Sequence, residues 1–196
     1  GVLNPISAKE MAENVKSDFK NINIEFHTHN DLGMATANAI ASVIGGADSI
    51  STTINGLGER AGNASMEEVV MGLKYSTNKD PGIKTKNLFN LSKLVAEYAL
   101  RPINVSKPII GELVLTHETG IHTNSILNNR NAYQLFPAEE VGKKESDFMY
   151  GKFTGSATLK YFLSRRGLLP DNETIKKLLE IVKNTAENKN RALTNN

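Results

Sequence analysis

The sequence contains no cysteine and carries little net charge. Without cysteine the 196-residue chain forms neither a disulfide framework nor a thiolate metal site, so any metal ion must be bound by nitrogen and oxygen ligands. The lack of cysteine also fits a reducing compartment. A net charge of +2 at pH 7 argues against nucleic acid or an anionic membrane surface as the main partner.

Long apolar runs are missing as well. No stretch approaches the roughly 20 apolar residues that span a bilayer, and the first residues, GVLNPISAKE, lack the charged and apolar regions of a signal peptide. Hydrophobic residues make up 39% of the chain and charged residues 22%, which is typical of a folded globular protein. We therefore expect a soluble, cytoplasmic protein with no membrane partner, large enough for one sizeable domain or for one domain and a small appendage.

The first part of the chain predicts alternating helices and strands. Ile22, Ile24 and Phe26 alternate with polar residues, as in a strand. The predicted elements are, in order, a helix from a Ser7 cap to about Phe19, a strand at 21–30, a helix at 34–44, a strand at 48–54 and a helix at 65–75 capped by Ser65. This order is typical of βαβ units around a parallel sheet, so the predicted fold class is α/β.

The character of the sequence changes after the last of these helices. Residues 1–77 hold two or three βαβ units, too few to close a sheet by themselves. Residues 78–108 predict a turn-rich linker with one amphipathic helix. Helical patterns return at 156–168 and 173–184, so residues 109–196 predict a small helical subdomain.

His27 and His29 form the first candidate site. Side chains alternate faces along a strand, so both imidazoles project to one side, with their Cα atoms about 7 Å apart. Two imidazoles on one face can bind a single cation, and an oxygen ligand from another strand would complete an open metal site. A pair of surface or packed histidines is the alternative for an H-x-H pattern taken alone.

The glycine-rich loop NGLGERAGN, residues 55–63, is the second candidate. Gly56, Gly58 and Gly62 permit positive φ, which lets backbone N–H groups approach a ligand. The loop lacks the Gly-Lys-Ser/Thr ending of a phosphate-binding Walker loop. The loop can bind a ligand if its polar side chains point into a site. The alternative is a connecting loop, without a binding role, before a capped helix. The side chains concerned are Glu59 and Arg60, as substrate-binding candidates, and Asn63.

A second histidine cluster lies between residues 117 and 133. It contains His117, Glu118, His122 and Tyr133. A histidine with an ordinary pKa near 6.5 suits proton transfer at neutral pH, and a tyrosine can orient or relay the proton. The alternative is a helix–turn segment whose histidines only satisfy backbone groups.

Three motifs together resemble one family. They are HTHNDLGMATAN at 27–38, TTINGLGERAGN at 52–63 and HETGIHTNSILNNRNAY at 117–133. In this order they closely resemble the homocitrate synthase and 2-isopropylmalate synthase family, which belongs to the metal-dependent TIM-barrel lyases. GVLNP resembles the end of that family's D-T-V-G-x-x-x-P segment. The resemblance extends to about Gly167 and implies the C-terminal part of a (β/α)8 TIM barrel, from the end of strand six to helix eight, followed by the helical subdomain.

The resemblance also implies roles for particular residues. His27 and His29 match divalent-metal ligands on barrel strand seven, and Asn63 lies in or beside the metal shell after strand eight. His122 and Tyr133 match the family's acid/base pair, in a subdomain that reaches into a neighbouring protomer's barrel. The implied cofactor is a divalent metal ion (Mg, Mn or Zn), and acetyl-CoA is the implied co-substrate.

The implied reaction is a Claisen-type condensation of acetyl-CoA with a 2-oxo acid, followed by thioester hydrolysis. HETGIH and NGLGERAGN look more like the homocitrate synthases associated with nitrogen fixation, which favours 2-oxoglutarate as acceptor and homocitrate as product. Condensation of the 2-isopropylmalate or citramalate type is one alternative. A non-catalytic regulatory or scaffold subunit is another.

The sequence departs from the family in two ways. The first half of the barrel, which carries a carboxylate metal ligand, a substrate-binding arginine and a catalytic glutamate, has no counterpart here. We therefore expect the chain to be inactive alone, either as a fragment or as one subunit of a split enzyme whose partner chain supplies that half, within an oligomer that exchanges subdomains. The family's G-K-H-S-G is GKFTG here, with Phe153 and Thr154 in place of histidine and serine.

Overall fold

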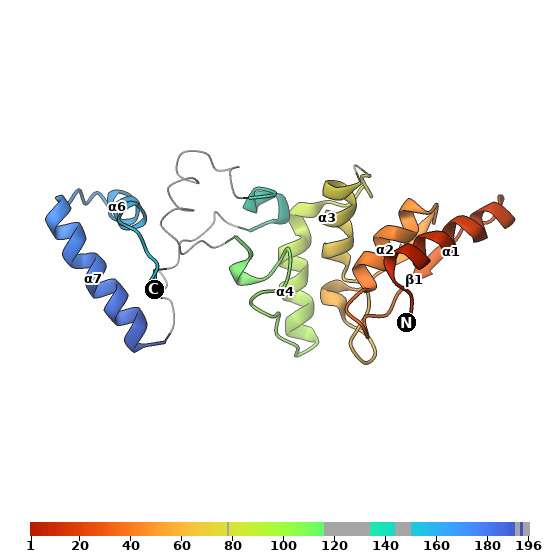
Figure 1. Ribbon diagram of the computed structural model, residues 1–196, viewed down its shortest axis with the longest axis horizontal. Coiled ribbons are helices and arrows are strands. Elements are labelled where there is room, and N and C mark those ends of the chain that lie inside the picture. The colour runs from red at the N-terminus through yellow and green to blue at the C-terminus, as the bar shows by residue number, and fades with distance from the viewer. Residues whose placement is uncertain (78, 116–133, 144–149, 191–192, 194–196) are drawn as a thin grey trace. The chain divides into compact units, whose positions relative to one another are not determined.

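The computed structural model describes residues 1–77, 79–115, 134–143, 150–190 and 193. The chain forms two compact units, Gly1–Gly111 and Glu112–Asn196. Figure 1 shows mostly helices in the described parts of both units.

The first unit is an α/β unit with a small parallel sheet. Its elements are α1 (Pro5–Asp18), β1 (Glu25–His27), α2 (Ala35–Ile44), β2 (Ser49–Ser51), the 3-10 helix η1 (Ile54–Gly56), α3 (Met66–Ser76), the 3-10 helix η2 (Thr85–Asn87) and α4 (Leu88–Tyr98). β1 and β2 pair in parallel, with Phe26 opposite Ile50 and His27 opposite Ser51. The predicted α/β class and order of elements are confirmed.

The start of α1 differs from the prediction. The helix begins at Pro5, and the Asn4 side chain rather than Ser7 caps it, with Asn4 Oδ1 accepting from Ser7 N at 3.0 Å. Proline suits this position because its fixed φ is helical and its missing N–H would have had no helical partner.

Ser65 precedes α3 as predicted, but its hydroxyl makes no cap hydrogen bond. The sequence Ser65-Met-Glu-Glu68 is typical of a capping box, in which the glutamate would reach back to the cap residue. Glu68 instead accepts from Thr36 Oγ1 at 2.9 Å and from Lys107 Nζ at 2.7 Å. Tertiary contacts across the unit therefore replace the local cap.

The core lies between α2, α3 and the sheet. α2 packs against both α1 and α3 (Figure 1). The small residues on α2 allow these helices to approach closely. The core cluster contains Ala35, Ala39, Ala64, Val69 and Leu73, with Ile40, Val43 and Ile50 packed against it. At the end of α2, a Cβ on Gly45 would overlap Lys9 O of α1, so this crossing requires glycine.

Both strands are shorter than predicted. β1 has three residues, and Ile22, expected at its start, is 56% exposed. A parallel sheet normally has neighbouring strands and helices on both faces. In the described part of the chain, each strand has one neighbour only, so the sheet has two open edges.

The second unit is helical in its described part. It contains the 3-10 helices η3 (Glu112–Leu115) and η5 (Ala138–Val141), then α6 (Ser156–Ser164) and α7 (Asn172–Asn188). Asp171 caps α7 by accepting from Thr174 N at 2.8 Å. α6 and α7 pack together, and Leu159 and Ile175 are buried.

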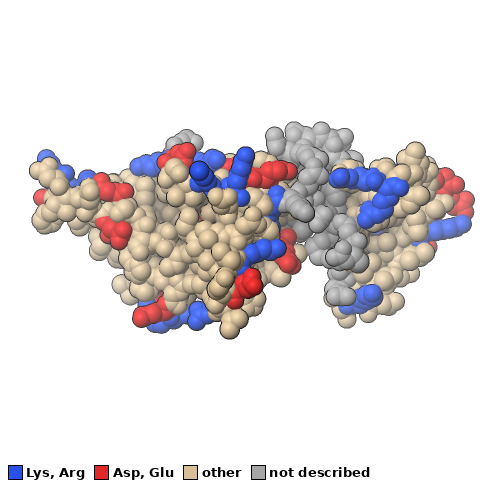
Figure 2. All heavy atoms as spheres, turned by 180° about the vertical axis from the view of Figure 1, so that it is seen from behind, with Lys and Arg blue, Asp and Glu red and all other residues tan. Residues whose placement is uncertain are grey.

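Charges of both signs are mixed over the surface shown in Figure 2, so neither sign dominates that face. Among the described residues, no helix has both the length and the apolar composition to cross a membrane.

Candidate functional site

The His27 and His29 rings lie side by side. His27 is the last residue of β1, and His29 forms an isolated antiparallel bridge with Asn63. The ring centroids are 4.8 Å apart and the rings meet edge to face, at 77°. The expected placement of both imidazoles on one side agrees with this geometry. Their assignment as metal ligands stays a prediction.

The Asn63 amide brings the two imidazoles together. Asn63 Nδ2 lies 3.0 Å from His27 Nε2 and 3.4 Å from His29 Nδ1, and it donates to Thr28 O at 3.2 Å. Asn63 is 6% exposed. One nitrogen of each ring therefore faces the buried amide nitrogen of Asn63.

Ser51 orients the His27 ring from the neighbouring strand. Its Oγ lies 3.1 Å from His27 Nδ1. These contacts fit the tautomer that carries its proton on Nδ1, which donates to Ser51 Oγ while Nε2 accepts from the Asn63 amide. In that tautomer Nε2 has the lone pair that a metal ligand requires. Ser51 was not among the residues found from the sequence, because only the strand register places it opposite His27.

This donor set fits a divalent metal ion. Imidazole side chains are nitrogen ligands that zinc and other transition metals accept. A half-turn of the Asn63 amide would turn Oδ1 toward the two rings, at the loss of its bond to Thr28 O, and would offer an oxygen ligand. Within the described residues there is no group of three or more His, Cys, Asp or Glu that could hold a metal ion.

The glycines of the 55–63 loop make room for Asn63. A Cβ on Gly58 would overlap Asn63 Oδ1, and a Cβ on Gly62, whose φ is +92°, would overlap Gly56 O. These two glycines therefore serve the packing of the loop on itself, in addition to any approach by a ligand.

Arg60 and Glu59 lie at the exposed tip of this loop. Arg60 Nε donates to Asp31 Oδ1 at 2.7 Å and Nη2 donates to Asp31 Oδ2 at 3.0 Å. These hydrogen bonds hold the pKa of the Asp31 carboxyl well below its usual range and raise the pKa of Arg60. The Glu59 side chain is 83% exposed, 3.5 Å from Arg60 Nη1. Arg60 thus has a protein partner, and substrate binding by either residue stays a prediction.

A buried carboxylate supports the start of the loop. Glu67 is 0% exposed, and its Oε2 accepts from Asn55 N at 3.2 Å. Asn55 has a left-handed φ of +60°, and its Nδ2 donates to Ser92 O at 2.8 Å. Lys107 Nζ lies 3.8 Å from Glu67 Oε1. Glu67 was not among the candidate residues found from the sequence.

The predicted acid/base residues His122 and Tyr133 lie outside the described residues, as does His117. The departure at 151–155 lies inside them. Thr154 is buried and accepts from Gly151 N at 2.7 Å, while Phe153 is 58% exposed. The Thr154 hydroxyl, which stands where the family has serine, therefore closes a local turn.

Two family models match this chain. The model described as HMGL-like matches residues 1–95, and the model described as Homocitrate synthase post-HMGL domain-like matches residues 109–190. The chain therefore matches an HMGL-like family model in its first part and a homocitrate synthase post-HMGL domain-like model in its second.

The chain is also similar to three kinds of curated synthase. The chain is 45% identical over 186 residues to 2-isopropylmalate synthase 2 of Caldanaerobacter subterraneus, covering 95% of the chain and 48% of the relative. It is 41% identical over 194 residues to homocitrate synthase 1 of Nostoc, covering 99% and 51%. It is 38% identical over 183 residues to (R)-citramalate synthase of Methanocaldococcus jannaschii, covering 93% and 37%.

The chain belongs to the homocitrate synthase and 2-isopropylmalate synthase family, which confirms the resemblance carried by the three motifs. It spans about half the length of the first two of these relatives.

Proposed function

We propose that the chain supplies one half of the active site of a synthase that condenses acetyl-CoA with a 2-oxo acid. Its first unit is the C-terminal part of a (β/α)8 barrel, from the end of strand six to helix eight, and its second unit is the helical subdomain. The order of the two matched family models and the parallel βαβ order of the first unit support this reading.

The single observation that carries the proposal is the convergence of His27 Nε2 and His29 Nδ1 on the amide nitrogen of Asn63. These three residues would hold a divalent metal ion, with Ser51 orienting the His27 ring. A metal ion bound there would supply Lewis-acid polarisation of the oxo acid's carbonyl group. His122 and Tyr133 of the second unit are the proposed acid/base pair that moves the proton of the acetyl methyl group.

We further propose that a complementary chain or segment, carrying the first half of the barrel, completes both the sheet and the metal site. The open sheet edges support this, because parallel strands are normally paired and covered. Exposed apolar side chains around α1 and before β1 support it as well, since a covered barrel would bury them. They include Ile6 at 70%, Met11 at 45% and Ile22 at 56% exposed.

2-Oxoglutarate is the proposed acceptor, giving homocitrate, because of the HETGIH and NGLGERAGN motifs. A second candidate is condensation of the 2-isopropylmalate or citramalate type, which is favoured by the 45% identity to a relative named 2-isopropylmalate synthase 2. The two candidates differ in the 2-oxo acid that accepts the acetyl group. The proposed metal ligands are the same in both.

The test is reconstitution. Copurification from the native source identifies the complementary chain, and CoA release from acetyl-CoA is then followed with a thiol reagent while 2-oxoglutarate, a branched 2-oxo acid or pyruvate is supplied. We expect release only from the mixed chains, fastest with 2-oxoglutarate. Release by this chain alone would contradict the split site, and a faster rate with another acid would favour the second candidate.

Variants separate catalysis from a scaffold role. His27→Ala and His29→Ala are expected to abolish CoA release while leaving assembly with the complementary chain intact. Glu173→Ala is the control, because it removes an exposed ion pair with Lys177 on α7. Full activity of both histidine variants would indicate the non-catalytic alternative.

A further inference from the structure

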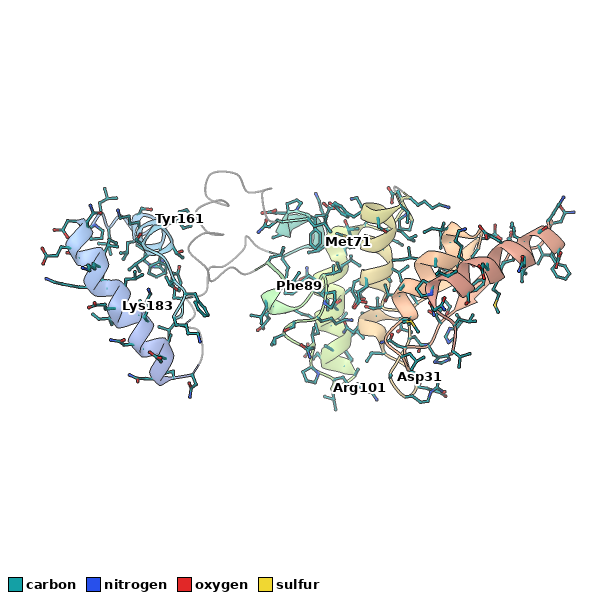
Figure 3. All side chains as sticks on the ribbon, viewed as in Figure 1. Asp31, Met71, Phe89, Arg101, Tyr161 and Lys183 are labelled. Atoms are coloured by element: carbon teal, nitrogen blue, oxygen red, sulfur yellow. The ribbon has the colours of Figure 1, made fainter. Side chains whose placement is uncertain are left out.

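Asp31 and Arg60 join the two loops that carry the candidate metal ligands. The guanidinium and the carboxylate form two parallel hydrogen bonds, of 2.7 and 3.0 Å. This arrangement fixes the relative orientation of the two groups as well as their distance. Asp31 follows His29 by two residues and Arg60 precedes Asn63 by three, so the pair connects the loops close to the ligands themselves. Figure 3 shows Asp31 among the loops of the first unit near the N-terminus.

Backbone hydrogen bonds continue this connection on both sides of Asn63. Asn30 N donates to Gly62 O at 2.9 Å, and Ala64 N donates to Thr28 O at 3.2 Å. Asn63 lies between Gly62 and Ala64, the two residues of the loop that make these bonds. Its position relative to the imidazoles is therefore set by how the 55–63 loop lies against the segment that follows β1.

The backbone of Arg60 is in a strained conformation. Its φ is +55°, in the left-handed region that residues with a Cβ rarely adopt. Such a conformation persists where surrounding interactions impose it. The two bonds to Asp31 tie the exposed loop tip to the rest of the unit, and they supply such an interaction.

We propose that Asp31 and Arg60 are positioning residues that hold the Asn63 amide against His27 and His29, and thereby set the affinity of this site for a divalent metal ion. The Nε–Nη2 edge of Arg60 is bound to Asp31 and is not available to a substrate carboxylate. In this role Arg60 acts through the position of Asn63. The metal affinity rests on the proposed function, whereas the positioning of Asn63 does not.

The experiment compares the full chain with Asp31→Ala, Arg60→Ala and the double variant. Glu173→Ala is the matched control, because it removes an exposed ion pair remote in sequence from the loops. Arg60→Gly removes the same side chain while relieving the left-handed strain, so it folds at least as readily as Arg60→Ala. The two measurements are the Zn²⁺ dissociation constant, by competition with a chromophoric chelator, and the NMR signals of the Asn63 side-chain amide, assigned by their loss in Asn63→Ala.

Each single variant is expected to bind Zn²⁺ about 10- to 100-fold more weakly, the range for groups that orient metal ligands. The double variant should be no weaker than the weaker single variant, because both act through one contact. The Asn63 amide signals should shift in all of these variants and stay unchanged in Glu173→Ala.

The inference is overturned if the Asn63 amide signals do not shift in Asp31→Ala and Arg60→Ala. It is also overturned if the parent chain binds Zn²⁺ and the variants bind it with the same affinity. If the parent does not bind Zn²⁺, the metal role under the proposed function fails. The amide signals then decide the positioning role on their own.

Discussion

Gly58→Ala tests how closely the 55–63 loop is packed around the Asn63 amide. A Cβ at this position would overlap Asn63 Oδ1 and lie 2.8 Å from Asn63 Cγ. The amide is buried and bonded to His27 Nε2 and Thr28 O, so it moves only by breaking these bonds. The added methyl group must therefore displace either the amide or the loop.

The expected cost follows from those two hydrogen bonds. Each contributes about 0.5–1.5 kcal/mol, so Gly58→Ala should lower the free energy of unfolding by about 1–3 kcal/mol, which is also the range for overpacked sites. Gly58 is not among the residues with positive φ, so alanine adds no backbone strain. For a unit near 100 residues, each kcal/mol lowers the midpoint of thermal unfolding by about 4–8 °C.

The assay is urea unfolding of Gly58→Ala, Asn63→Ala and the double variant, followed by circular dichroism. In the Asn63→Ala background the side chain that meets the methyl group is gone, so adding Gly58→Ala should cost less than about 0.5 kcal/mol. An equal cost in both backgrounds would refute the reasoning, because the overlap with Asn63 would then not be its cause.

Three further predictions concern the surroundings of the site. Glu67→Ala should cost about 1–3 kcal/mol in urea unfolding, because it leaves Asn55 N without its acceptor, whereas Glu67→Gln should cost less. Ser51→Ala should weaken Zn²⁺ binding about 10-fold in a chelator competition, since it removes the partner of His27 Nδ1. The pKa of Asp48 is lowered by the Lys16 ammonium and by a backbone N–H, so its stabilisation is present above the unfolded pKa, near 3.9, and is lost as pH falls below it. The parent should therefore lose more stability than Asp48→Asn between about pH 5 and 3. If the midpoint of urea unfolding fell by the same amount in both proteins across that range, the prediction would be wrong.

Sequence patterns predicted the helices better than the strands, for a physical reason. A helix closes its hydrogen bonds locally, so periodicity and end residues were sufficient to locate α2 and α3. Strand length depends on neighbouring strands, and β1 has three residues where the alternation predicted ten. The Ser7 cap was wrong because Asn4 and Pro5 provide a better local start.

The candidate site was predictable in part. The alternation of side chains along a strand indicated that His27 and His29 share a side, although His29 lies beyond β1 and is held by its bridge to Asn63. Ser51 and Asp31 could not be found in this way, because their partners are 24 and 29 residues distant and depend on register and loop packing.

The open edges of the two-stranded sheet also have a consequence for handling the chain. Unpaired N–H and C=O groups along a strand are a template for further strand addition, and natural proteins protect such edges with charge, proline or covering segments. Exposed Ile22 lies just before one of these strands. The isolated polypeptide should therefore form concentration-dependent aggregates rich in intermolecular β-structure, visible as growing light scattering and an amide I band shift on concentration.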